Sequence, residues 1–144
     1  VTDFSKTVFS HNLEKHNRRF RVSRIPATAE ELTAWANDVG YEMTFAGPLA
    51  NVLEDSDVII AISSSGNSPN VVKAVELAKS RHVPVIGLSG FDQGNKLNQL
   101  ADAKIHVPTE KGEYEVVESA HGMIMHLMTK YFKDYFDRLV EREA

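Results

Sequence analysis

The stretch DVIIAISSSGNSPNVVKAVELAKSRHVPVIGLSG, residues 57–90, decides the fold of this chain. It opens with a continuous aliphatic run, DVIIAIS (57–63), which has the length of a strand buried on both faces, as in parallel sheets. SPNVVKAVELAKSRH (68–82) predicts a helix, and VPVIGLSG (83–90) predicts a second buried strand. Two buried strands joined through a helix form the unit from which parallel α/β sheets are built.

The segments that follow extend this alternation. NKLNQLA (95–101) predicts a short helix, AKIHVP (103–108) a third strand, and residues 113–144 a long amphipathic helix. The order strand, helix, strand, helix, strand is typical of an α/β fold with a doubly wound parallel sheet, of the flavodoxin or Rossmann kind. Right-handed crossovers then place helices on both faces of the sheet.

Further elements are expected before the first of these strands. They are an amphipathic helix over residues 3–20, a short strand over 24–29, and helices over 28–38 and 43–57. Gly47-Pro48 is expected to break or kink the last of these helices. We find no repeat, low-complexity tract or linker, so residues 1–144 are interpreted as a single domain.

The composition limits the class of function. The chain has 144 residues and a formal net charge of -4, and 42% of its residues are hydrophobic, as in ordinary soluble globular proteins. The acidic balance and the lack of a long Lys/Arg run argue against a nucleic-acid partner. The absence of cysteine excludes disulfides, thiolate zinc sites and cysteine nucleophiles, and it fits a cytoplasmic protein. No apolar run approaches about 18 residues, so we expect no membrane-spanning helix.

The segment SSSGNS, residues 63–68, joins the first buried strand to the next helix, and we call it the serine loop. In α/β folds, ligands bind at the carboxyl ends of the strands, which is where this loop lies. Ser68 suits the N-cap and Pro69 the first helical position, so free backbone N–H groups and the positive end of the helix dipole face the loop. Gly66 allows a close approach of the backbone. Hydroxyl groups that can donate to phosphate oxygens come from Ser63, Ser64, Ser65 and Ser68.

The ligand of such a loop is expected to be a phosphomonoester. The loop contains no Lys and does not match GxxxxGK[ST], so a nucleoside triphosphate site is not expected. The alternative is a polar turn that only caps the helix, because turns of this kind are often rich in Ser and Gly.

Residues 57–90 resemble the central segment of the SIS (sugar isomerase) domain family, and most closely its phosphoheptose isomerase branch. That branch has a strand, a loop of the STSGNS type, a helix, a strand and the tripeptide LTG in this order. Weaker matches are WANDVG (35–40) and VVESAHGMIMH (116–126), and the resemblance covers most of residues 25–140. It implies the SIS fold. Since no strand precedes the first helical pattern, we expect residues 1–144 to lack the family's N-terminal helix and first strand.

The resemblance also implies roles for particular residues. Glu118 and His126 take the positions at which the family's C-terminal helix supplies a Gln and, eight residues later, a His to the active site. On a helix these two side chains point within roughly 80° of each other, so they could meet in one pocket as catalytic groups. The implied substrate-binding residues are Ser63, Ser64, Ser65, Asn67, Ser68, Asn37 and Asp38.

The histidines also have a simpler interpretation. His126 could pack among neighbouring methionines, and Glu118 could be a solvated surface residue. The remaining histidines carry no signal and are interpreted as surface or edge positions: His11, His16, His82 and His106.

The family's enzymes interconvert an aldose and a ketose phosphate through an enediol, and they assemble as homotetramers with sites built between subunits. In phosphoheptose isomerases the base is a Glu four residues after a His, on the helix that follows a GNGGS-type loop. GNGGS is absent here. In one register the His and Glu positions hold Lys6 and Ser10; in another they hold His11 and Lys15, with Glu14 beside the latter. Neither register supplies both groups. The same positions contribute to a zinc site in some family members, so the resemblance allows a divalent metal without assigning ligands.

Three interpretations follow. The first is an isomerase that converts sedoheptulose 7-phosphate into heptose 7-phosphate. The second is a non-catalytic phosphosugar sensor or a protein-binding adaptor, which would keep the serine loop and lose the base. The third is another phosphosugar enzyme of the same fold with Lys6, Lys15 or His11 as base, although a Lys near its usual pKa of about 10.4 is a poor base unless it is desolvated.

Overall fold

The structure is a computed structural model and describes residues 21–143. The chain divides into two compact units. The first is Ile25–Ser119, and the described residues of the second are 21–24 and 120–143. Within the described residues, no helix is both long and apolar enough to cross a bilayer. The helix predicted over residues 3–20 lies outside the described residues, and the single-domain interpretation stays a prediction.

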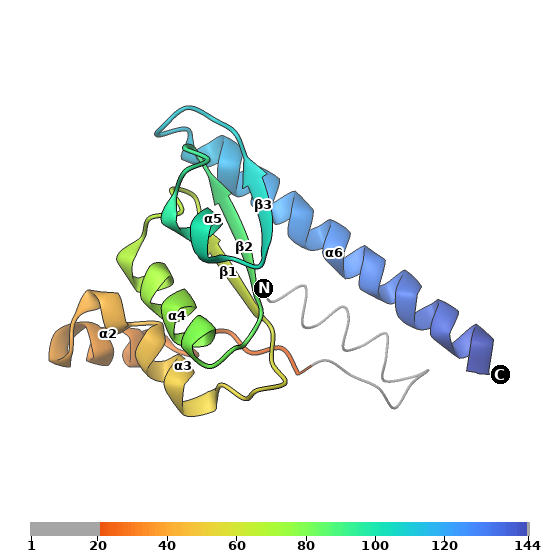
Figure 1. Cartoon of the computed structure of the whole chain (residues 1–144), viewed down its shortest axis with the longest axis horizontal. Coiled ribbons are helices and arrows are strands. Elements are labelled where there is room, and N and C mark those ends of the chain that lie inside the picture. The colour runs from red at the N-terminus through yellow and green to blue at the C-terminus, as the bar shows by residue number, and fades with distance from the viewer. Residues whose placement is uncertain (1–20, 144) are drawn as a thin grey trace. The chain divides into compact units, whose positions relative to one another are not determined.

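The first unit is built on a sheet of three parallel strands, shown in Figure 1. The strands are β1 (Ile59–Ser63), β2 (Val85–Gly90) and β3 (Ala103–Val107), in the spatial order β1-β2-β3. Ser63 is paired with Ser89, and Ser89 with His106. Because the strands are parallel and in this register, their carboxyl ends lie side by side, and polar residues of all three strands meet there.

Two crossover helices cover one face of this sheet. α4 (Pro69–Ser80) joins β1 to β2, and α5 (Lys96–Leu100) joins β2 to β3. Both helices lie on the same side of the strands (Figure 1), as right-handed crossovers require when the strand order advances in one direction. The predicted parallel α/β arrangement is thus confirmed, and helices on the second face stay a prediction. Strands and helices share one buried core, made of Ala61, Val71, Val75, Ala78, Val83, Val85, Leu97 and Ala101.

Three shorter elements precede β1: α2 (Ala29–Asp38), the 3-10 helix η1 (Tyr41–Met43) and α3 (Ala46–Val52). The Thr28 hydroxyl accepts the Glu31 N–H at 3.2 Å, so α2 has the cap that its sequence predicts. The prediction of a strand over residues 24–29 is wrong, since no strand forms there and α2 begins at Ala29.

The sequence predicted a break or kink in a helix at Gly47 and Pro48. No helix is kinked at these residues. They lie in the first turn of α3, where the missing N–H of a proline costs no hydrogen bond. A Cβ on Gly47 would stand 2.4 Å from the ring of Trp35. The glycine is therefore needed for the close packing of α2 against α3.

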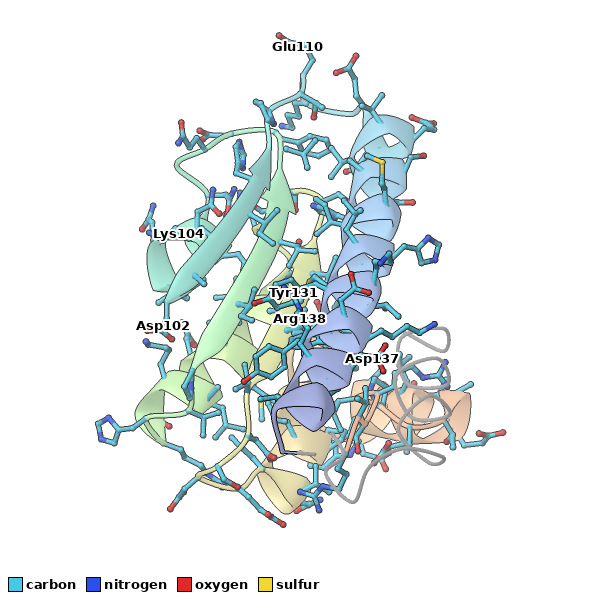
Figure 2. The ribbon with its side chains drawn as sticks, turned by 90° about the vertical axis from the view of Figure 1, so that its right-hand side faces the viewer. Asp102, Lys104, Glu110, Tyr131, Asp137 and Arg138 are labelled. Atoms are coloured by element: carbon cyan, nitrogen blue, oxygen red, sulfur yellow. The ribbon has the colours of Figure 1, made fainter. Side chains whose placement is uncertain are left out.

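The last element, α6 (Tyr114–Glu143), begins in the first unit and continues through the second. In the second unit the rings of Tyr131 and Tyr135 are stacked with centroids 6.3 Å apart and remain 59% and 45% exposed; Figure 2 labels Tyr131 on this helix. The core of the second unit has Phe136 at its centre, packed against Val22, Met125, Met128, Phe132 and Leu139.

Candidate functional site

The serine loop lies at the carboxyl end of β1 and leads directly into α4. Its Ser64 carbonyl accepts the backbone N–H of Gly90, at the end of β2, at 2.8 Å. A Cβ on Gly90 would lie 2.6 Å from Val117 in the first turns of α6. The bare glycine therefore lets β2, the loop and the start of α6 approach one another closely.

Ser63 and Ser68 form the closed base of the loop. Ser63 is 6% exposed, and its hydroxyl lies 3.0 Å from that of Ser68 and accepts the Gly66 N–H at 3.1 Å. One of the two hydroxyl hydrogens is used between them, so the pair keeps one hydrogen for a ligand. Ser68 occupies the N-cap position as predicted, but its side chain makes no cap hydrogen bond and instead pairs with Ser63.

Ser65 and the start of α4 supply further donors. The Ser65 hydroxyl accepts the Asn67 N–H at 3.2 Å and keeps its own hydrogen free to donate. Pro69 opens α4, and within the described residues the N–H of Asn70 has no acceptor. These donors and the positive end of a twelve-residue helix suit an anion.

Glu118 lies beside the loop. The Ser64 hydroxyl donates to the Glu118 carboxylate at 3.5 Å, across 54 residues of sequence. The structure therefore brings together a phosphate-type loop and the carboxylate to which the family resemblance assigns a place in the active site. Glu118 is exposed, so a ligand bound by the loop could reach it.

Asn67, predicted to bind substrate, is largely occupied by the loop itself. Its Oδ1 accepts the Lys96 N–H at 3.1 Å, and its Nδ2 donates to the Ser65 carbonyl at 3.2 Å. One Nδ2 hydrogen remains for a ligand. The contacts of Asn67 thus support the shape of the loop, and its role in binding substrate stays a prediction.

Asn37 and Asp38 are exposed in the last turn of α2. Among residues 21–143, neither side chain forms a hydrogen bond with the serine loop. No hydrogen bond among the described residues therefore links them to the loop, and their predicted place near the sugar stays a prediction.

His126 belongs to the second unit and is exposed, so it does not pack among the methionines as the simpler interpretation held. Its catalytic role stays a prediction. His121, five residues before it on α6, is 4% exposed. The candidate bases before residue 21 lie outside the described residues: Lys6, His11, Glu14 and Lys15. So does Ser10, which fills the Glu position in one register.

The part of the chain that the structure describes contains no group of three or more histidines and carboxylates placed to hold a metal ion. Among the predicted site residues that contact the loop, Glu118 is the one with a carboxylate, and it accepts a hydrogen bond from the Ser64 hydroxyl. Two of the positions that the family resemblance names for a metal lie before residue 21, outside the described residues, so a zinc ion stays a prediction.

The sequence analysis missed a polar cluster behind the loop, made of Ser89, Asn95, Asn98 and His106. His106 lies on the edge strand β3 and is half-buried, as the interpretation of a surface or edge position allowed. What the sequence did not predict is its contact with the cluster: its Nδ1 lies 3.2 Å from both the Ser89 hydroxyl and the Asn98 amide. The signal available in the sequence was a pair of asparagines three residues apart at the start of a short helix, which is typical of a cap.

Comparisons with known proteins agree with these features. The family model described as "SIS domain" matches residues 26–130. The phosphoheptose isomerase of Fusobacterium nucleatum is 37% identical over 124 residues, covering 82% of this chain and 62% of the relative. That of Nitratiruptor sp. is 35% identical over 123 residues, covering 85% of this chain and 64% of the relative. The chain thus spans less than two thirds of the length of these relatives.

Solved structures are also similar. The phosphoheptose isomerase from Neisseria gonorrhoeae superimposes with a TM-score of 0.69 at 26% identity, covering 89% of this chain and 70% of that one. The enzyme from Francisella tularensis has a TM-score of 0.72 at 24% identity, covering 92% and 69%. The second likeness concerns the fold alone.

Proposed function

Since this chain belongs to the SIS domain family, we propose that it binds a sugar phosphate through the serine loop and isomerises it between ketose and aldose. The proposed reaction converts sedoheptulose 7-phosphate into heptose 7-phosphate through an enediol. The observation that carries the proposal is the contact of Ser64 with Glu118, which pairs an anion-binding loop with a carboxylate. The phosphoheptose isomerases to which the chain is similar support the same reaction.

In the proposed complex, the phosphate accepts hydrogen bonds from Ser65, from the Ser63–Ser68 pair and from the N–H of Asn70. The N-terminal end of α4 carries roughly half a positive elementary charge, which attracts the phosphate. Glu118 as a carboxylate can only accept hydrogen bonds, so it is suited to the hydroxyl groups of the sugar and not to the phosphate.

The chemistry needs one group to remove a proton from the carbon beside the carbonyl and another to move a proton between the two oxygens. Glu118 is our candidate for the first task, because a carboxylate beside the bound phosphate can reach the carbon chain. His126 is our candidate for the second, since imidazole both donates and accepts protons near neutral pH.

The test is proton NMR of sedoheptulose 7-phosphate with the protein in heavy water. Appearance of the heptose phosphate, or uptake of deuterium beside the carbonyl, supports the isomerase. Glu118→Gln keeps the size of the side chain and should abolish exchange while leaving binding intact. Ser63→Ala and Ser65→Ala should weaken binding itself, by roughly tenfold for each lost hydrogen bond. Turnover that survives Glu118→Gln would exclude Glu118 as the base.

The second candidate is a non-catalytic phosphosugar sensor or protein-binding adaptor. It is favoured by the N-terminal helix, where neither register supplies both the His and the Glu of the family's enzymes. Broadening of the sugar signals without turnover or exchange would support this candidate. Absence of any interaction with sugar phosphates would contradict the isomerase and the phosphosugar sensor, and would leave the protein-binding adaptor.

We propose in addition that the protein acts as a cytoplasmic homotetramer with sites shared between subunits. Three large apolar side chains on α6 support self-association, since Met123, Leu127 and Tyr131 are 60%, 61% and 59% exposed. A shared site would also explain how Asn37 and Asp38 could take part although no hydrogen bond among the described residues links them to the loop of their own chain.

A further inference from the structure

The polar cluster of Ser89, Asn95, Asn98 and His106 takes no part in the proposed chemistry, yet most of it is deeply buried. Ser89, Asn95 and Asn98 are 0%, 2% and 5% exposed. Burial of polar groups destabilises a fold unless each group is hydrogen-bonded. Such a cluster directly behind a ligand loop therefore calls for a functional reason.

Asn95 is held rigidly at the centre of this cluster. Its Nδ2 donates to the Ser89 hydroxyl at 3.0 Å and to the Asp92 carbonyl at 2.7 Å. Its Oδ1 accepts the Asn98 N–H at 2.9 Å and so caps α5. Both Nδ2 hydrogens and the carbonyl oxygen have partners, so the side chain has one orientation.

The partners of Asn95 are themselves fixed from three elements. The Ser89 hydroxyl, on β2, donates to Asn98 Oδ1 at 2.9 Å, and Asn98 Nδ2 donates to the Gln93 carbonyl at 3.1 Å. His106, on β3, closes the cluster, with its Nδ1 3.2 Å from both Ser89 Oγ and Asn98 Nδ2. Asn95 is thus anchored directly to β2 and α5, and through Ser89 and Asn98 to β3.

The outer side of Asn95 lies against Gly66 of the serine loop. A Cβ on Gly66 would stand 2.0 Å from Asn95 Oδ1 and 2.1 Å from its Cγ. Gly66 has a φ of 64°, and its N–H donates to the Ser63 hydroxyl at 3.1 Å. The turn that orients Ser63 therefore rests directly on the Asn95 side chain.

The first turn of α5 holds the same part of the loop. The Leu97 N–H donates to the Gly66 carbonyl at 2.9 Å, and the Lys96 N–H donates to Asn67 Oδ1 at 3.1 Å. Because Asn95 caps this turn, the side chain that supports Gly66 also fixes the two N–H groups that bind the loop.

We propose that Asn95 is a positioning residue of the serine loop. Through Gly66 it sets where the hydroxyls of Ser63 and Ser65 stand, and thereby where the phosphate binds. Asn95 itself contacts no ligand. The ligand in this inference rests on the proposed function, whereas the effect of Asn95 on the geometry of the loop does not depend on it.

The test uses Asn95→Ser in the full chain. Serine is also a good N-cap, so α5 keeps its cap while the support beside Gly66 is lost. The variant should bind sedoheptulose 7-phosphate roughly tenfold or more weakly in calorimetry, because the loop donors lose their alignment. Amide hydrogen exchange at Gly66 and Leu97 should accelerate roughly tenfold or more relative to the core strands.

Val83→Ala is the matched control, since Val83 is 1% exposed in the core and far in sequence from the loop. Val83→Ala should lower the melting temperature, but it should neither weaken ligand binding nor accelerate exchange at Gly66 and Leu97 relative to the core strands. Should Asn95→Ser fail to fold, Asn95→Thr takes its place, because threonine is also a good N-cap and fills more of the space. It still lacks the amide beside Gly66 and should show the same two effects.

The outcomes separate the two proposals. Wild-type exchange at Gly66 together with wild-type affinity in a folded Asn95 variant overturns the positioning role. If the wild-type chain binds no sugar phosphate, the proposed function fails, and exchange at Gly66 alone then decides the role of Asn95. If Val83→Ala weakened ligand binding and accelerated exchange at Gly66 as much as the Asn95 variant does, the two effects would follow from lower overall stability. This result would also overturn the inference.

Discussion

Gly66 is the residue at which the serine loop has the least tolerance for change. Its φ of 64° lies in the left-handed region, where a residue with a Cβ costs roughly 1–2 kcal/mol. The added methyl would also collide with Asn95. We therefore expect Gly66→Ala to destabilise the fold by about 1–2 kcal/mol or more and to weaken phosphate binding, as measured by denaturant unfolding and calorimetry.

Gly112→Ala is the control for this prediction. Gly112 also has a positive φ, 105°, but a Cβ there would have nothing within 4 Å. It should lose stability through backbone strain alone and keep its ligand affinity. Equal ligand affinity in the two variants would contradict the importance of the contact between Gly66 and Asn95.

At the residue scale, the sequence predicted which residues lie in and beside the loop. It did not predict which hydrogen bonds these residues form. The serines could be found because a Ser-rich loop after a buried strand has a chemical meaning, whereas Glu118 was found only through the family resemblance. The pairing of Ser63 with Ser68, the occupied amide of Asn67 and the cluster around Asn95 could not, since these contacts depend on atomic positions that the tertiary fold sets.

At the scale of the element, the strands and crossover helices were predicted almost to the residue. Continuous aliphatic runs permit few alternatives, and Pro69 and Thr28 mark the starts of α4 and α2. The segment before β1 was predicted less well, because short proline-containing stretches carry no periodicity. The solved structures that superimpose on this chain confirm the predicted α/β SIS fold.

Asp102 links three elements, and its contacts lead us to expect a stability that depends on pH. Its carboxylate binds Lys79 at the end of α4 and accepts the Val85 N–H at 2.8 Å at the start of β2. The Lys79 hydrogen bond, followed by that of Val85, holds the pKa of Asp102 below its usual value of 3.8. A lowered pKa in the folded state means that this stabilisation is present above pH 3.8 and is lost as the pH falls through the folded value.

We therefore expect Asp102→Asn to melt at a lower temperature than wild type at pH 7, and the difference to shrink below pH 3.8. Calorimetric scans at both pH values measure it. Lys79→Met removes the main cause of the lowered pKa of Asp102. In a chain with Lys79→Met, the added change Asp102→Asn should therefore lower the melting temperature at pH 7 by less than it does in the wild type. A difference that stays constant down to pH 2 would show that the ionised form of Asp102 contributes nothing.

At the scale of the whole molecule, the apolar row on α6 makes the prediction. Met123, Leu127 and Tyr131 follow one another at intervals of four residues, so they are neighbours along the helix surface. We expect Leu127→Asp to shift the mass in solution from about four chains toward a single chain of 16.1 kDa, measured by light scattering.

Val52→Asp is the matched control, since Val52 is 51% exposed at the end of α3, outside this row. It should leave the mass unchanged. An unchanged mass in Leu127→Asp would exclude this part of α6 as the interface. Sequence could supply the apolar residues of α6, but not which of them are exposed, because that depends on how each residue is packed.

The strand order also has a consequence for the two edges of the sheet. Within residues 21–143, β1 pairs with β2 alone, so the backbone groups along its other side are unpaired, and its sequence IIAIS carries no charge. The opposite edge differs, because β3 and the residue before it carry the exposed Lys104 and Asp102, labelled in Figure 2. An uncharged open edge is a template for other strands. Among the described residues, β1 is therefore the side of the sheet at which we expect a further strand to pair, and β3 the side that its charges protect.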